Sequence, residues 1–270
     1  MKKHIGTHII LILGAAVMAS AFAWMLSTSL MTESESKAVP IALAPHAPQW
    51  GNYAEAWSKA PFGRYFFNSI VTSAAVTAGV LFTSILAGYA FACLEFRGKN
   101  VLFGVLLATM MIPFEVTVVP NSLIVQWLGW YNTYLALIIP WTANVFSIFL
   151  LRQFFRSLPK DYFEAAQIDG CGHWRYLWSV AVPMVSPALV TAALFAFLGS
   201  WNSLLWPLIV TDSEAMRTLQ FGLTVFLQEE QTSTHLLMAA AAFTIAPVVI
   251  LYLILQRRFI EGVTGTGLKQ

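Results

Sequence analysis

Long apolar runs separated by short polar segments dominate the chain. Residues 9–31 and 65–94 contain no charged residue, and each run exceeds the roughly 20 residues that a helix needs to cross a bilayer. A third apolar run starts at residue 100, is interrupted only by Glu115 and continues to Leu151. Because this run is too long for one crossing, we place a turn at residues 129–132, where Gly-Trp-Tyr-Asn combines a chain reversal with interfacial aromatic residues.

Two further apolar regions complete the pattern. Residues 176–211 carry no charge, and Pro183 and Pro187 predict that the first part of this region lies at the membrane surface rather than across it. The pattern therefore predicts an all-α, polytopic integral membrane protein with six transmembrane helices in a single domain over 1–270. The predicted spans are about 9–31, 68–92, 101–123, 133–151, 188–208 and 236–256.

Composition agrees with this class of protein. Hydrophobic residues make up 58% of the chain and charged residues 10%, against roughly 25% charged residues in soluble domains. Such a sequence excludes a soluble globular fold. The two cysteines, Cys93 and Cys171, are far apart and form no metal or redox motif. The five histidines form no ligand cluster, although His4 and His8 are four residues apart.

The distribution of Lys and Arg predicts the orientation. With the N-terminus inside, only Lys37, Lys59, Arg64 and Arg217 fall in outer loops. Both termini, and the loop 152–183, are therefore expected in the cytoplasm. A cleavable signal peptide ending near Ala19-Ser20-Ala21 is the competing interpretation; the apolar run continues well past this site, which favours an uncleaved first helix. The remaining cations are all assigned to the inside: Lys2, Lys3, Arg97, Lys99, Arg152, Arg156, Lys160, Arg175, Arg257, Arg258 and Lys269.

The outer segment 32–64 is the longest polar stretch, and it includes a possible short helix at 52–59. The other long polar interruption, residues 164–183, predicts two short helices with a break at Asp169-Gly170. Pro159 suits the first turn of the first helix, and Gly170 can adopt the left-handed conformation that closes such a helix. Pro183 is expected to end the second helix.

This hairpin resembles the EAA loop of ABC importer permeases. The pattern is Glu-Ala-Ala, three residues, Gly, nine residues, then apolar, any residue, apolar and Pro. The chain is also similar over nearly its whole length to the carbohydrate branch of maltose and glycerol-3-phosphate permeases. Cys171 departs from the usual Ala. The matching residues are Glu164, Ala165, Ala166, Gly170, Val180, Val182 and Pro183, with Leu158-Pro159, Trp201-Asn202, Trp206-Pro207 and the ending 256–264.

The resemblance implies a transmembrane subunit of an ATP-driven, binding-protein-dependent importer in a bacterial inner membrane, carrying a sugar, polyol or glycerophosphate. It implies as partners a second permease subunit, two cytoplasmic ATPase subunits and an extracytoplasmic solute-binding protein. Small side chains allow close approach of a partner, a carboxylate can pair with its cations, and Tyr162, Phe163, Trp174 and Trp178 are apolar anchors. The expected ATPase-coupling residues are Glu164, Ala165, Ala166, Asp169, Gly170 and Pro183.

Several residues within the spans are candidates for the translocation path. Glu115, between Pro113 and Pro120, is an ionisable residue inside a predicted span, which makes it a functional candidate; the alternative is packing against a partner subunit or a backbone amide. Trp and Asn can stack on and hydrogen-bond a sugar, or they can bridge helices. Substrate contacts can also come mainly from the partner permease. The other candidates of this kind are Asn144, Trp201, Asn202 and Trp206.

Two further segments are assigned to partners. The loop 212–235, with Glu229 and Glu230, is expected outside, facing the binding protein. The tail 261–270 resembles family tails that reach the ATPase interface, and the alternative is a disordered end.

Other function classes receive less support from the residues. No Gly-x-x-x-x-Gly-Lys-Ser/Thr phosphate loop occurs, so this chain is not expected to hydrolyse ATP; ATP and Mg are assigned to the partner subunits and no cofactor to this chain. No catalytic set points to an enzyme. The principal alternative is an ion-coupled secondary transporter using Glu115, and a membrane enzyme with a lone catalytic glutamate is a more distant one.

Overall fold

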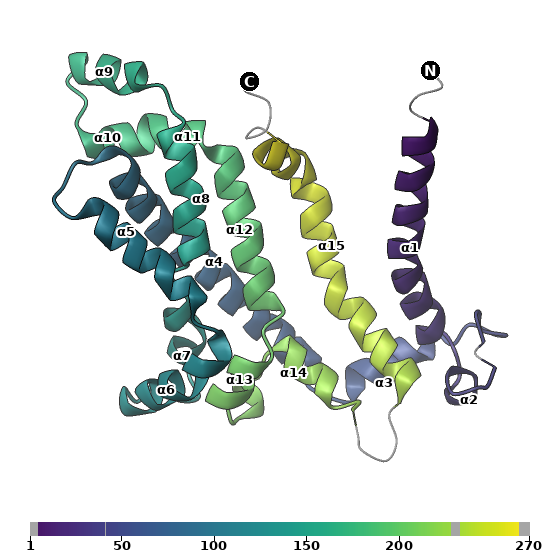
Figure 1. The fold of residues 1–270 in the computed structure, drawn as a ribbon. Helices are drawn as coiled ribbons and strands as arrows, with labels where there is room; N and C mark the ends of the chain where they lie inside the picture. The colour runs from purple at the N-terminus through teal and green to yellow at the C-terminus, as the bar shows by residue number, and fades with distance from the viewer. Residues whose placement is uncertain (1–4, 41, 228–232, 265–270) are drawn as a thin grey trace. The chain divides into compact units, whose positions relative to one another are not determined.

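The computed structural model describes residues 5–40, 42–227 and 233–264, with side chains from Gly6 to Gln256. Every regular element in these residues is a helix (Figure 1), which confirms the all-α prediction. Glu229, Glu230 and the tail from residue 265 lie outside the described residues. The elements are α1 Ile5–Ser29, α2 Glu33–Ser36, α3 Gly51–Ser58, α4 Phe62–Cys93, α5 Lys99–Ala108, η2 Thr109–Met111, α6 Phe114–Trp127, α7 Tyr134–Ile138, η3 Ile139–Trp141, α8 Val145–Arg156, α9 Lys160–Ile168, α10 His173–Tyr176, η4 Leu177–Ala181, α11 Val182–Met184, α12 Ser186–Trp201, α13 Leu205–Val210, η5 Glu214–Met216, α14 Leu219–Thr224 and α15 Thr234–Thr264.

Three of the described helices are long and apolar enough to cross a membrane by themselves. They cover Gly6–Ser29, Phe62–Cys93 and Thr234–Gln256. Three more apolar stretches pass the same test only as bent pairs, so counting each pair as one span gives six spans. The pairs are Lys99–Met111 with Phe114–Trp127 at 101°, Tyr134–Trp141 with Val145–Ser157 at 40°, and His173–Met184 with Ser186–Trp201 at 81°.

The bends divide ranges that the apolar pattern predicts as single spans. The range 101–123 is interrupted at Ile112, which adopts an extended conformation (φ −86°, ψ 114°) before Pro113. A residue that precedes proline is pushed out of the helical region by the proline ring. The range 188–208 is likewise divided, because α12 ends at Trp201 and α13 begins at Leu205. Each interruption frees backbone hydrogen-bonding groups, and at the first one the helix changes direction by 101°.

The described chain forms two compact units. The first lies within residues 5–65 and 219–249, without residues 41 and 228–232, and the second within residues 66–218 and 250–264. In the first unit, Phe62 is fully buried at the start of α4. Its ring contacts aromatic rings from other segments of the unit, with centroids 6.0 Å from Trp57, 6.2 Å from Phe226 and 5.0 Å from Phe243, and it also contacts its neighbour Tyr65 at 6.0 Å. This aromatic cluster joins α3, the start of α4, the turn after α14 and α15 within the unit.

The expected short helix at 52–59 is present as α3, one residue earlier. Asn52 is buried, and its Nδ2 donates to the carbonyl oxygens of Ser29 at 2.9 Å and Met31 at 2.8 Å. Ser29 is the last residue of α1 and Met31 lies just after it, where no further helical turn supplies a donor. The asparagine therefore closes α1 and fixes α3 against it.

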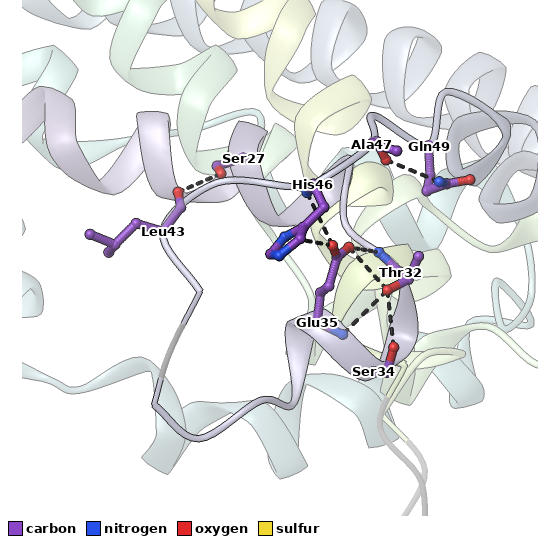
Figure 2. Close-up of polar contacts among 8 residues, drawn as sticks. All are labelled: Ser27, Thr32, Ser34, Glu35, Leu43, His46, Ala47 and Gln49. Carbon is purple, nitrogen blue, oxygen red and sulfur yellow. Dashed lines mark hydrogen bonds and ion pairs between the residues drawn. The ribbon is translucent and has the colours of Figure 1, made fainter.

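Glu35 organises the loop that follows α1 (Figure 2). The backbone N–H and hydroxyl of Thr32 donate to Glu35 Oε2 at 2.8 and 3.0 Å, and the backbone N–H of His46 donates to Oε1 at 3.0 Å. The Glu35 N–H donates in return to Thr32 Oγ1 at 3.3 Å, completing a capping box. Bonds from the Thr32 and His46 backbone N–H groups hold the pKa of Glu35 below its ordinary value. One carboxylate thus ties two ends of the loop together.

In the second unit, α4 closely approaches both the segment just before α8 and the second half of α8, because glycines face these contacts. A Cβ at Gly79 would lie 2.6 Å from Thr142 Cγ2, and a Cβ at Gly88 would lie 3.1 Å from the backbone nitrogen of Arg152. Between them, Thr83 Oγ1 donates to the Thr142 carbonyl at 2.7 Å. Small residues at helix contacts give van der Waals packing where lipid supplies no hydrophobic drive.

Two buried clusters lie at opposite ends of the second unit (Figure 1). One joins α4, α8, α10, η4 and α12 and includes Tyr89, Phe155 and Tyr176. The other joins α6, α7 and α13 and includes Val125, Leu137 and Trp206. These clusters hold the two ends of the helices in fixed positions.

The expected reversal at 129–132 is present. Gly129 and Asn132 adopt positive φ values of 70° and 58°. Asn132 Oδ1 accepts from the backbone N–H groups of Asp212 at 3.0 Å and Ser213 at 3.1 Å, and its own N–H donates to the Val210 carbonyl at 2.9 Å. This turn is therefore attached to the end of α13.

The α4–α8 contact predicts the effect of adding a methyl group. Gly79→Ala should lower stability by about 1–3 kcal/mol, because overpacking must displace Thr142. Gly104→Ala is the matched control: nothing lies within 4 Å of a Cβ at Gly104, and alanine gains up to about 1 kcal/mol in a helix. Thermal unfolding in detergent measures both variants. Equal melting temperatures for the two variants would contradict the close contact.

The Glu35 hydrogen bonds predict the behaviour of the loop amides. Glu35→Gln should speed hydrogen exchange at the Thr32 and His46 amides at neutral pH, because an amide oxygen is a weaker acceptor than a carboxylate. Since the folded-state pKa is depressed, the protection is present above the ordinary glutamate pKa and is lost as pH falls through the lowered one. Glu55→Gln, in an exposed pair with Lys59, is the control. Unchanged exchange in Glu35→Gln would refute the role of this carboxylate.

Candidate functional site: a helical hairpin and a pocket

The first helix of the hairpin, α9, begins directly after Pro159. Pro159 occupies the N-cap position with φ −58° and ψ 134°, one residue earlier than the first-turn position that its sequence predicts. Its fixed φ suits this position, and its ring sets the direction in which the helix leaves the chain. Asp161 lies in the first turn, where its negative charge is favourable near the positive end of the helix dipole. Glu164 follows in the second turn and is exposed.

Gly170 closes α9 as expected. It adopts φ 73°, which a residue with a Cβ enters only at a cost. Its N–H donates to the Gln167 carbonyl at 3.0 Å, and the Cys171 N–H donates to the Ala166 carbonyl at 2.8 Å. These two bonds form a Schellman motif, with Asp169 as the C-cap residue. The glycine therefore reverses the chain and allows the second helix to pack against the first.

The second helix of the hairpin is not regular. It runs from His173 to Met184 through a π-helical turn at Leu177–Ala181, and Pro183 lies within its last turn. The helix ends one residue after the proline that was expected to end it. At that point the chain bends by 81° into α12. A π turn accommodates an extra residue in the helical ladder and is often found at functional positions.

Aromatic contacts fix the hairpin to the rest of the second unit. The Phe163 ring on α9 stacks on His173 with centroids 4.7 Å apart and meets Tyr176 edge-on at 4.9 Å. The hydroxyl of Tyr89 on α4 shares a hydrogen bond of 2.9 Å with His173 Nδ1. Tyr89 in turn contacts Phe155 on α8, at 5.7 Å between centroids. The hairpin is thus held on the ends of α4 and α8 by its inner face.

The opposite face of the hairpin is exposed and unusually apolar. Tyr162 is 49% exposed, Ile168 87% and Trp174 65%. Glu164 and Ala165 are exposed on the same short helix. Apolar side chains exposed together on a well-anchored element indicate a protein-binding surface. The aromatic residues predicted as anchors are therefore divided, because Phe163 packs inward whereas Tyr162 and Trp174 face outward.

A pocket of about 330 Å³ lies in the second unit between α4, α12 and the N-cap of α8, with walls from α6, α7 and α13. Its polar lining consists of hydroxyl and amide side chains: Thr72, Asn144, Ser200, Ser203 and Thr218. Its aromatic lining consists of Phe114, Trp141, Phe195 and Trp206. Hydroxyl and amide groups beside aromatic faces can hydrogen-bond and stack on a hydroxylated ligand.

The pocket includes two of the residues that the sequence assigns to a translocation path. Asn144 caps α8, its Oδ1 accepting from the Ser147 N–H at 2.9 Å, and Trp206 donates from Nε1 to the Ala136 carbonyl at 2.9 Å. Trp201 does not line the pocket; it is buried against Phe66 and Phe197.

The remaining two candidates lie outside the pocket lining. Asn202 is the C-cap residue of α12. Glu115 is exposed in the first turn of α6, directly after the bend, and does not line the pocket. A carboxylate in a first helical turn is favoured by the helix dipole.

Thr218 lines the pocket but carries no sequence signal. Its side chain is buried, and its Oγ1 has no hydrogen-bond partner in the described structure. A buried hydroxyl without a partner carries a free-energy cost that a ligand hydroxyl can remove. Only the folding of α4 and α12 against the segment before α14 brings this threonine to the pocket. Within the side chains that the structure describes, no group of three His, Cys, Asp or Glu residues is placed to hold a metal ion.

Three of the known proteins that are similar in sequence to this chain are all named as permease proteins. The chain is 36% identical to the sulfoquinovosyl glycerol transport system permease protein SmoH of Agrobacterium fabrum, over 91% of this chain and 87% of that one. It is 31% identical to the sn-glycerol-3-phosphate transport system permease protein UgpE of Yersinia enterocolitica, over 96% and 95%. It is 33% identical to the diacetylchitobiose uptake system permease protein NgcG of Streptomyces coelicolor, over 96% and 86%.

The fold is similar to a chain in a crystal structure of a bacterial ABC transporter involved in the import of the acidic polysaccharide alginate. The TM-score is 0.83 at 23% identity, covering 94% of this chain and 95% of that one. The sequence profile of the family described as "Binding-protein-dependent transport system inner membrane component" matches residues 79–265. These findings confirm the resemblance carried by the hairpin motif. The chain belongs to this family, the inner membrane permease subunits of ABC importers.

Proposed function

We propose that this chain is the permease subunit of an ATP-driven importer for a sugar, polyol or glycerophosphate, and that its hairpin couples ATPase closure to opening of the pocket. One observation carries the proposal: the helices that hold the hairpin also line the pocket. Tyr89 and Thr72 lie on α4, Phe155 and the cap residue Asn144 on α8, and α12 follows the hairpin directly. Movement of the hairpin is thereby transmitted to the pocket through continuous helices.

The proposed assembly contains a second permease subunit, two ATPase subunits in the cytoplasm and an extracytoplasmic solute-binding protein. ATP and Mg belong to the ATPase subunits in this proposal. The Lys and Arg distribution supports a cytoplasmic hairpin and cytoplasmic termini. The printed functions of the relatives support the substrate class, since they include a sulfoquinovosyl glycerol, an sn-glycerol-3-phosphate and a diacetylchitobiose permease. The hydroxyl, amide and aromatic lining of the pocket is suited to such molecules.

The hairpin transmits force as a rigid body in this mechanism. An ATPase cleft that closes on the exposed face, around Glu164 and Ala165, displaces α9 together with the helix that begins at His173. The Phe163 and Tyr89 contacts carry the displacement to α4, and the bend after Met184 carries it to α12. No observation favours an ion-coupled transporter using Glu115, because this carboxylate is exposed and does not line the pocket.

The coupling proposal predicts the effect of changing the hairpin. Glu164→Lys combined with Gly170→Leu should lower ATP-driven uptake at least about ten-fold, because the carboxylate partner is lost and the left-handed turn is strained. Uptake and ATP hydrolysis are measured in proteoliposomes containing the complete transporter. Gln167→Lys is the control, since it adds positive charge at another exposed position of α9. The proposal fails if the double variant transports like the wild type.

The pocket proposal predicts the effect of filling the cavity without a clash. Nothing lies within 4 Å of a Cβ at Gly199, which lines the pocket. Gly199→Leu should therefore fold and assemble but lower uptake about ten-fold, because the leucine occupies space that the substrate needs. Gly104→Leu, also with open space at its Cβ but away from the pocket, should transport normally. Wild-type uptake by Gly199→Leu, at normal levels of assembled complex, would exclude the pocket from the path.

A further inference from the structure

A second, larger hollow lies away from the transport pocket, on the side of the hairpin lined by Phe163 and Glu164. It is an open groove of about 860 Å³ where α4 ends, α5 begins and α8 runs into α9. Four cationic side chains line it, from Lys99, Arg152, Arg156 and Lys160, together with two carboxylates, from Glu95 and Glu164. We call it the basic groove. The excess of cations makes it attractive to an anion.

Two of the cations are held in place by the fold. Arg152 is 9% exposed; its Nε donates to the Phe91 carbonyl at 3.1 Å, and its guanidinium lies 3.9 Å from the centroid of the Phe103 ring. Lys99 Nζ donates to the carbonyl oxygen of Leu94 at 2.7 Å, at the end of α4. These contacts fix the positions of two positive charges in the groove, so the site is built into the fold rather than formed by mobile surface lysines.

Two helix N-termini also face the basic groove. Gly98 and Pro159, the N-cap residues of α5 and α9, both line it, and neither helix has a side-chain cap. The first N–H groups of a helix have no partner within the helix, and together with the helix dipole they form a ready site for an anionic oxygen. Their convergence with Arg152 and Lys160 indicates a phosphate ligand.

The carboxylates do not cancel this attraction. The Glu95 side chain is 93% exposed at the rim, 3.7 Å from Lys99, and Glu164 is exposed on α9. Arg156 and Lys160 are also exposed, so they can turn towards a ligand that enters the groove. The interior of the groove therefore stays positive.

An apolar surface continues from the groove along α5. Phe96 and Val101 line the groove and are 39% and 71% exposed, and Leu102 and Val105 continue the surface at 55% and 60% exposed. The groove begins where the apolar helix α4 ends. A ligand that matches both parts carries a phosphate at one end and hydrocarbon at the other. Basic pockets at the end of membrane helices bind anionic lipid headgroups in this way.

We propose that the basic groove binds the phosphate of an anionic phospholipid headgroup, whose acyl chains lie along the exposed apolar side of α5. The apolar surface of α5 favours a lipid over free phosphate as the source of this anion. The charge excess favours a lipid with a net negative headgroup over a zwitterionic one.

The test is lipid binding to the purified full-length chain in detergent, measured by native mass spectrometry with equal amounts of phosphatidylglycerol and phosphatidylcholine. The wild type should retain phosphatidylglycerol in preference. Arg156→Gln with Lys160→Gln should weaken that binding by roughly 10- to 30-fold, the effect of two cations at a membrane surface. Arg156→Lys with Lys160→Arg keeps both charges and should keep the binding, which separates charge from folding.

The matched control is Arg175→Gln with Lys59→Gln, which removes two cations that do not line the groove and should leave binding unchanged. Equal retention of the two lipids by the wild type would overturn the proposal, as would wild-type binding by the Gln variant of Arg156 and Lys160. Displacement of the lipid by millimolar inorganic phosphate would assign the groove to free phosphate instead. Complete displacement by added ATPase subunits would assign it to the protein partner. None of these results depends on transport, so the proposed function is tested separately.

Discussion

The aromatic packing beneath the hairpin is the contact on which the function of the second unit depends. Phe163 has one ring face against His173 and an edge against Tyr176, and Tyr89 connects this group to α4. Without these contacts, α9 would be a nine-residue helix with too few hydrogen bonds to persist by itself. With them, its exposed residues form one face of a fixed body. A surface that must respond to a moving partner needs such rigidity, because a mobile loop would absorb the displacement.

The membrane helices must also be held rigidly, and close packing at glycines rather than aromatic contact does this. Hydrocarbon surroundings give no hydrophobic drive for one helix to pack on another, so α4 packs by close approach of Gly79 to Thr142, just before α8, and of Gly88 to α8 itself. That approach leaves the same two helices supporting the hairpin at one end and bordering the pocket at the other. Buried clusters at both ends keep the helices in register. The two helices thus link the hairpin to the pocket, although no single residue has to contact both.

Local features of the fold could be predicted from the sequence where one residue type has one strong conformational preference. Gly170 adopts the expected left-handed conformation, and the turn expected at residues 129–132 is present, with positive φ at Gly129 and Asn132. Pro113 and Pro120 indicate that the helix can bend here, but the size of the bend, 101° before Phe114, could not be predicted, because the apolar pattern shows length but not direction. The pocket was only partly predicted for a similar reason. Trp201 and Trp206 look equivalent in the sequence, yet Trp201 is buried away from the pocket whereas Trp206 lines it. Thr218 and the basic groove depend on segments that only the tertiary fold brings together.

The 81° bend between the hairpin helix and α12 has a mechanical consequence. Two rigid helices are joined near a right angle, so a displacement along the axis of one helix rotates the other about the bend. The π turn at Leu177–Ala181 lies within the hairpin helix, close to the bend, where the helical hydrogen-bond ladder is least regular. A small thrust on the hairpin along its axis would thus tilt α12 across the membrane rather than slide it through. A tilt of this kind changes the width of the space beside Ser200 without pulling any residue out of the bilayer.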